Sequence, residues 1–311
     1  MKRVLALGIV AVLLFGASMS EAKSGKKAKP APADADRFNA DTKNYTIEEG
    51  NAAKAARDRD AVLNAFTKTI VFHSLPTQGE LYSVASIPRT SAIIDTGEPS
   101  PKESLYQRAK GIRNLEMKVV LSGAMKESDA NKVLLSDGLA LVLDLRTAQD
   151  ISEDFLMMQS DYFPFTPKVV RLPLSLLNQE NITKLKYLRS YSLELELDRP
   201  LTPAQRKMID KFYKTVFKHF IVTSADAKLL ASIKGLGNMI VSFDMRQVQN
   251  PSTLVSTINT ALPKVDKGVV VEGPFSPQQT RYLGGIKNLK LMTIHMKSEL
   301  DDQFRQFLSS R

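Results

Sequence analysis

Residues 276–296 read SPQQTRYLGGIKNLKLMTIHM, and this stretch decides the fold expected for the chain. It opens with Ser276-Pro277, a hydroxyl N-cap before a proline at the first helical position, which predicts a short helix. Gly284-Gly285 predicts a turn, and the apolar residues from Leu289 onward predict a strand. The stretch is therefore a helix–turn–strand unit.

Units of this kind recur along the chain. The first strongly apolar residues of ten expected strands are Ile70, Ile93, Leu115, Leu139, Val169, Tyr191, Phe220, Met239, Val269 and Leu289. Further helix N-caps are expected at Ser100, Ser128, Thr202 and Ser224. Taken two at a time from Leu115 onward, the strands are spaced by about 50 residues, which indicates a repeat made of two unequal βα units.

The strands themselves favour an open architecture. Residues 191–198 alternate between polar and apolar side chains. A closed parallel barrel buries both strand faces and is expected to show continuous hydrophobic strands, so alternation indicates that one face meets water or a partner. We therefore expect an open α/β repeat solenoid of about ten βα units. A closed (β/α)8 barrel is the alternative, because leaving out the weak strands at Ile70 and Ile93 gives a count of eight.

Three stretches share the spacing L-x-x-L-x-L around a strand. They are Ile286-x-x-Leu289-x-Leu291, Ile112-x-x-Leu115-x-Met117 and Leu236-x-x-Met239-x-Val241. In this spacing the chain resembles leucine-rich-repeat proteins over about residues 69–297. The resemblance implies a horseshoe whose strand-lined concave face binds a macromolecule.

The N-terminal segment predicts export. Lys2 and Arg3 precede an apolar run from Val4 to Phe15, and small residues lead up to a cut after Ala22. An apolar run this short does not reach the roughly 20 residues needed to span a bilayer, so residues 1–22 are expected to be a signal peptide. The product is expected to be soluble and periplasmic or extracellular, with no transmembrane segment after cleavage.

The other domain boundaries follow composition. Residues 23–45 are expected to be a disordered linker, 46–68 an N-terminal capping helix, 69–298 the α/β repeat domain and 299–311 a C-terminal capping helix. The chain has no cysteine, so it cannot carry a lipid-modified cysteine, a disulfide or a thiolate metal site. We therefore expect that it is not a lipoprotein.

Polar strand positions fall on one face of the expected sheet. They give a candidate binding surface of Asp144, Arg146, Arg171, Glu194, Glu196, Asp198, His219, Asp244, Arg246 and Glu272. The functional interpretation is a recognition surface for a protein or an anionic envelope polymer, which the net charge of +10 would favour. The alternative is a solvated face crossed by ion pairs, each worth about 0–1 kcal/mol.

Catalysis and metal binding are the less favoured interpretations. If the barrel were right, Glu194 or Glu196 could act with Asp244 or Glu272 as a glycosidase-like carboxylate pair in a periplasmic hydrolase. In an open array Glu196 and Glu272 would lie roughly 14 Å apart, too far for that chemistry. The sequence therefore favours a non-enzymatic binding or scaffold protein of the cell envelope, without a cofactor.

The three histidines do not suggest a metal site. His73, His219 and His295 fall on the first, seventh and tenth expected strands, so an open array would keep them apart. No metal is predicted.

A basic helix is expected over residues 203–218. Arg206, Lys207, Lys211 and Lys214 could make a weak contact with an anionic surface, although a solvated outer face is the favoured interpretation. Export argues against a nucleic-acid partner.

Overall fold

The computed structural model describes residues 66–97, 103–109, 112, 114–122, 139–212, 216–248, 251–273 and 282–296. All of them lie in one compact unit, Asn51–Arg311. The expected signal peptide, linker and C-terminal helix fall outside the described residues, as does nearly all of the expected capping helix. Within the described part of the chain, every helix is too short or too polar to cross a membrane.

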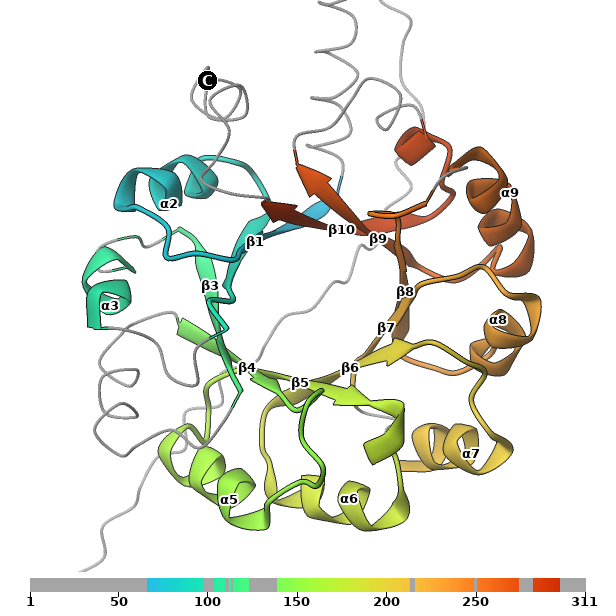
Figure 1. Cartoon of the computed structure of the whole chain (residues 1–311), viewed down its shortest axis with the longest axis horizontal. Coiled ribbons are helices and arrows are strands. Elements are labelled where there is room, and N and C mark those ends of the chain that lie inside the picture. The colour runs from blue at the N-terminus through green and yellow to red at the C-terminus, as the bar shows by residue number, and fades with distance from the viewer. Residues whose placement is uncertain are drawn as a thin grey trace, which may run out of the picture. The chain divides into compact units, whose positions relative to one another are not determined.

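Ten parallel strands form a closed barrel, in which each strand pairs with its neighbours in sequence and β10 pairs with β1 (Figure 1). The strands are β1 (Thr67–Phe72), β2 (Thr90–Ile94), β3 (Glu116–Leu121), β4 (Leu139–Asp144), β5 (Lys168–Pro173), β6 (Tyr191–Leu197), β7 (Lys218–Val222), β8 (Met239–Asp244), β9 (Lys267–Gly273) and β10 (Leu289–Met296). All ten expected strands are thus confirmed.

Helices cover the outside of the barrel (Figure 1). They are α2 (Gln78–Ala85), α3 (Glu103–Ala109), α5 (Glu153–Tyr162), α6 (Gln179–Lys184), α7 (Pro203–Phe212), α8 (Ala227–Ile233) and α9 (Pro251–Ala261), with 3-10 turns η1 (Leu174–Leu176) and η2 (Leu185–Tyr187). Most helices have ten residues or fewer, so they depend on packing against the barrel for stability.

The predicted helix caps can be compared at two described positions. Thr202 caps α7 as expected, because its Oγ1 accepts from the Gln205 N–H at 3.2 Å. The cap of α8 is Asp226 rather than Ser224, since the Asp226 carboxylate accepts from the Leu229 N–H at 2.8 Å. The caps expected at Ser100, Ser128 and Ser276 lie outside the described residues.

The expectation of an open, leucine-rich-repeat-like solenoid is wrong. The first and last strands hydrogen-bond to each other, with Ile70 opposite Ile294, so the sheet has no free edge. The alternative, a barrel, is right about closure but wrong about the count of eight. The width of the barrel explains the error: eight strands leave an interior just filled by side chains, and ten leave a wider one. The inner strand face can therefore be polar without facing the outside.

The spacing of about 50 residues has a counterpart at the N-terminal ends of the strands. Four odd-numbered strands have a buried lysine as their first or second residue. The backbone N–H of each lysine donates to the backbone carbonyl of a residue with positive φ that lies just before the next strand. The four pairs are Lys68 with Arg89, Lys168 with Ser190, Lys218 with Asn238 and Lys267 with Asn288. The buried Met117 takes the lysine position between β3 and β4. The paired unit of about 50 residues therefore recurs around the closed barrel.

The two faces of the strands have different surroundings. Outward-facing residues such as Leu141, Leu195 and Val269 pack with the helices into one large hydrophobic core. On the inner face, Val71, Ile93, Val120 and Val142 form a separate small apolar cluster, joined by Val169. The remaining inner positions are largely polar, and they surround the candidate site.

Candidate functional site

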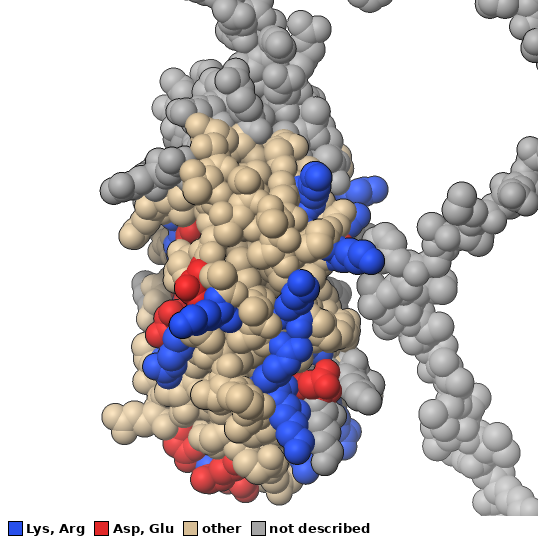
Figure 2. Space-filling model, turned by 90° about the vertical axis from the view of Figure 1, so that its right-hand side faces the viewer, with Lys and Arg blue, Asp and Glu red and all other residues tan. Residues whose placement is uncertain are grey.

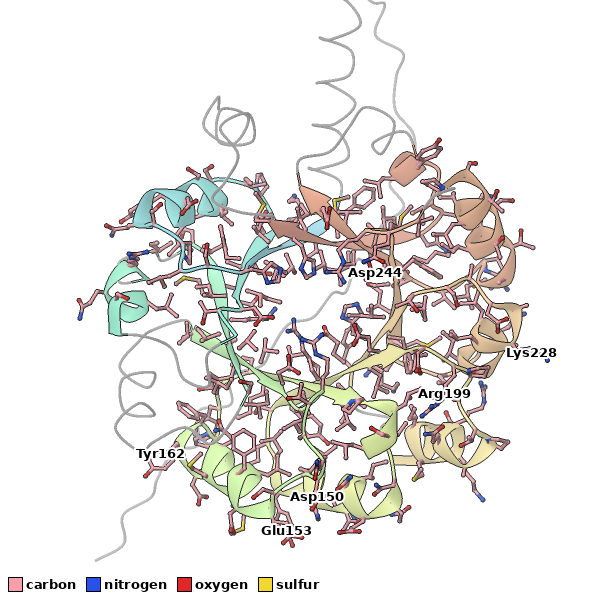
Figure 3. All side chains as sticks on the ribbon, viewed as in Figure 1. Asp150, Glu153, Tyr162, Arg199, Lys228 and Asp244 are labelled. Carbon is pink, nitrogen blue, oxygen red and sulfur yellow. The ribbon has the colours of Figure 1, made fainter. Side chains whose placement is uncertain are left out.

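The barrel encloses a cavity of about 850 Å³ whose lining includes residues of nine of the ten strands and Arg246, which follows β8. The strand face that the sequence analysis took for an outer recognition surface is this inner lining, so the expectation of a protein-binding face on an exposed sheet is wrong. Figure 3 shows the difference: Asp244 lies on the inner side, whereas Glu153 and Tyr162 of α5 and Lys228 of α8 lie among the outer helices.

Closure brings the predicted site residues together. Those that line the cavity are Arg146, Arg171, Glu194, Glu196, His219 and Arg246. Asp144 and Asp244 end their strands behind two of these arginines. Glu272 lies near the end of β9 and interacts electrostatically with Arg246. Asp198 follows the end of β6, is exposed, and is not among the described residues that line the cavity.

Arg171 is a buried cation surrounded by carboxylates. Its Nε donates to Glu194 Oε1 at 2.7 Å, and its Nη1 lies 3.3 Å from Asp95 Oδ2 and 3.6 Å from Asp144 Oδ2. Burial alone would raise the pKa of Glu194, but the charge of Arg171 and the hydrogen bond from His219 lower it below its ordinary value. Glu194 therefore stays ionised at neutral pH and cannot act as a general acid.

A chain of hydrogen bonds continues from Glu194 across two strands. Glu194 Oε2 lies 3.0 Å from His219 Nδ1, and His219 Nε2 lies 2.7 Å from Ser242 Oγ. Because an ionised carboxylate only accepts, Nδ1 donates to Glu194, and Nε2 on the other side of the ring shares a hydrogen bond with the Ser242 hydroxyl.

Ser242, His219 and Glu194 are hydrogen-bonded in the same order as the serine, histidine and carboxylate of a hydrolase triad, but a substrate has no access to the serine hydroxyl. Ser242 is fully buried, and a Cβ on Gly268 would lie only 2.1 Å from its Oγ. A substrate in the cavity could not reach this hydroxyl. Ser242 therefore positions His219, and the sequence analysis missed it because it pairs with His219 only across strands β7 and β8.

Two identical arginine forks lie at the C-terminal ends of β4 and β8. Asp144 accepts from the backbone N–H, Nε and Nη2 of Arg146 at 3.1, 2.9 and 2.6 Å. Asp244 accepts from the same three groups of Arg246 at the same distances. The hydrogen bonds to Asp144 and Asp244 raise the pKa of each arginine, so both side chains are permanent, oriented cations.

Two histidines meet where the barrel closes. His73 Nε2 lies 2.8 Å from His295 Nδ1, and the rings stack with centroids 5.0 Å apart. Burial, together with the charges of Arg246 and His73, lowers the pKa of His295 to about 4. The expectation that these histidines would lie far apart is wrong, because it assumed a sheet with two free ends. Because the two histidines lie 222 positions apart, nothing in the sequence pattern predicted this contact.

The described residues contain no group of three or more His, Asp or Glu side chains placed to hold a metal ion. His219 bonds to Glu194 and Ser242 and does not join the pair formed by His73 and His295.

The expected basic helix is shorter than predicted. It ends at Phe212, and Lys218 instead lies buried at the start of β7. Arg206 donates to the carbonyl groups of Ser232 and Lys234, so it ties α7 to α8. Lys207 is exposed. The right-hand side of the barrel in Figure 1, where α7 is labelled, carries a column of Lys and Arg side chains in Figure 2. Lys214 and the side chain of Lys211 lie outside the described residues.

Comparison with known proteins does not place the chain in a family. No protein-family model matches the chain, and no curated protein matches it. Among solved structures, it resembles Streptococcus suis SuiB bound to S-adenosylmethionine, with 11% identity and a TM-score of 0.38, covering 80% of this chain and 64% of SuiB.

Two further structures are similar at the same low level. A putative lyase/mutase from Burkholderia cenocepacia J2315 has 10% identity and a TM-score of 0.31, with 78% of this chain and 81% of that chain covered. A protein from Aquifex aeolicus VF5 has 10% identity and a TM-score of 0.34, with 82% and 92% covered. Likenesses of this size carry no argument about activity.

Proposed function

We propose that this protein binds a small polar molecule inside its barrel. The observation that carries the proposal is the cavity of about 850 Å³ with charged residues held in fixed positions on its wall. Ligand pockets typically measure about 300–1,000 Å³ and use a few well-placed polar groups for specificity. The barrel encloses this strand face, which favours a small ligand over a macromolecule.

The position of the charged groups supports a binding site. Asp144 and Asp244 end their strands, and His73 directly follows β1, so these groups share the C-terminal rim of the barrel. In (β/α)8 barrels the same rim carries the functional groups, because the loops that follow the strands can vary without disturbing the sheet. Arg146 and Arg246 are already oriented by their aspartates, which lowers the cost of ordering them when a ligand binds.

A cysteine-accessibility experiment tests the proposal. The chain has no cysteine, so each introduced cysteine is the only thiol that can react. Thr293 lines the cavity, so Thr293→Cys should react with a small methanethiosulfonate reagent and should be protected by a bound ligand. Ser256→Cys, exposed on α9, is the reactive control, and Val271→Cys, buried in the outer core, is the unreactive control. If Thr293→Cys reacted no faster than Val271→Cys, the lumen would be closed to small molecules and the proposal would be wrong.

The proposal includes export, which rests on residues 1–22 alone. N-terminal sequencing of the protein recovered from its native compartment should find Lys23 as the first residue. Recovery of the uncleaved chain in the cytoplasmic fraction would contradict export without affecting the lumen proposal.

A further inference from the structure

We infer that the ligand of the lumen is an α-amino acid with an apolar side chain, an inference that rests on the proposed function and names its ligand class. Three features of the lumen point to this ligand class: one loose pair of opposite charges, an arginine held for carboxylate binding, and an apolar wall beneath them.

The loose pair is formed by Arg146 and Glu196. Arg146 Nη1 lies 3.8 Å from Glu196 Oε2, which is beyond hydrogen-bond distance, and their side chains are 39% and 43% exposed. Arg171 and Glu194, by contrast, are joined at 2.7 Å with exposures of 9% and 13%. Arg146 and Glu196 thus face the cavity with opposite charges that do not satisfy each other.

An α-amino acid fits this pair, because it carries a carboxylate and an ammonium group on one carbon. In the arginine fork at β4, Asp144 accepts from Nε and Nη2 of Arg146, which leaves Nη1 toward the lumen. A guanidinium held in this way is suited to a carboxylate, and the nearby carboxylate of Glu196 accepts from an ammonium group. A simple anion would leave Glu196 without an ammonium partner, and a simple cation would leave Nη1 of Arg146 without a carboxylate partner.

The wall beneath the charged rim selects the side chain. Val142 lies two residues before Asp144 on the inner face of β4, and Val169 holds the matching place before Arg171 on β5. Both line the cavity together with Ile93. Val169 is partly exposed, whereas Val142 and Ile93 are buried behind it, so a ligand whose charged group lies between Arg146 and Glu196 meets apolar surface chiefly at Val169. Burying an aliphatic side chain there is favourable by the hydrophobic effect.

Three compounds of similar shape test the ligand class. L-leucine carries both charged groups, 4-methylpentanoate only the carboxylate, and isopentylamine only the ammonium group. Titration calorimetry with the full barrel at pH 7 should show L-leucine binding at least about tenfold more tightly than either analogue, since each charged hydrogen bond contributes about that factor or more. Equal or weaker binding of L-leucine would overturn the inference.

A variant at Glu196 tests the named residues. Glu196→Gln should remove most of the preference for L-leucine over 4-methylpentanoate, while Glu153→Gln on the outside of α5 should leave it unchanged. Glu196 is half exposed and only loosely paired, so this variant should keep the unfolding midpoint of the parent. An unchanged preference in Glu196→Gln would overturn the assignment of the ammonium site.

The reactivity of Thr293→Cys separates this inference from the function on which it rests. Protection by D-glucose or succinate, without protection by L-leucine, would uphold binding in the lumen and overturn the ligand class. Failure of Thr293→Cys to react at all would overturn both.

Discussion

Replacing Arg171 with methionine should destabilise the barrel strongly at neutral pH. Arg171 is 8% exposed, and its guanidinium lies within 4 Å of carboxylate oxygens of Asp95, Asp144 and Glu194. Methionine keeps much of the side-chain volume but removes the charge. Glu194 would then be an ionised, buried group without its main counter-charge, and breaking a buried ion pair in this way typically costs about 3–5 kcal/mol.

The cost should depend on pH in a defined direction. In the parent protein the pKa of Glu194 is lowered, so Glu194 contributes stability above its unfolded pKa, and this contribution is lost as the pH falls through the folded value. Burial is the largest single influence on the pKa of Glu194 and raises it; without Arg171 only His219 still opposes burial, so the pKa of Glu194 rises. The variant therefore regains stability on acidification, when Glu194 can take up a proton, and the difference from the parent should shrink toward pH 4.

Urea unfolding followed by circular dichroism measures this difference. At pH 7 we expect a loss of about 3–5 kcal/mol in the free energy of unfolding. Arg171→Met combined with Glu194→Gln should recover part of it, because no uncompensated charge remains on Glu194. A loss below about 1 kcal/mol at pH 7, the size of an exposed pair, or a loss that grows toward pH 4, would refute the reasoning.

Three further predictions concern single contacts. Gly268→Ala should destabilise the barrel by about 1–3 kcal/mol in urea unfolding, because the new methyl group would lie 2.1 Å from Ser242 Oγ. Gly237→Ala is the control: its methyl group meets nothing within 4 Å, so it should change the free energy of unfolding little. Thr202→Ala should lower the free energy of unfolding by about 1 kcal/mol through loss of the α7 cap, and a change below a few tenths would contradict that role. His295 should titrate by NMR near pH 4, and a midpoint near 6.5 would show that its surroundings are not those described.

The sequence predicted the position of each strand but did not predict that the strands close into a barrel. Local alternation and caps located all ten strands, because burial of one face imposes a period of two on the side chains. Closure depends on the tilt and stagger of strands that lie far apart in sequence, such as β1 and β10, and no local pattern records them. The rule that parallel strands read as hydrophobic runs failed here, since it assumes an interior packed with side chains.

The same limit applied to the site. Polar residues on the inner face, including Arg146, Glu196 and Arg246, could be found because alternation marks them as one set. Their grouping around a cavity could not be found without closure. The contact between His73 and His295 joins residues 222 positions apart, and the burial of Ser242 depends on the missing side chain of Gly268 on the next strand.

Stability and binding should therefore depend on the same carboxylates. The pKa values of Asp144, Asp244 and Glu194 are all lowered: burial opposes this, and the arginines and their hydrogen bonds outweigh it. Each contributes stability above its unfolded pKa and loses that contribution as acid protonates it. A protonated aspartate also stops orienting its arginine, so Arg146 would lose the geometry needed for a ligand carboxylate. Acid should consequently weaken ligand binding in the lumen over the same pH range in which it destabilises the barrel.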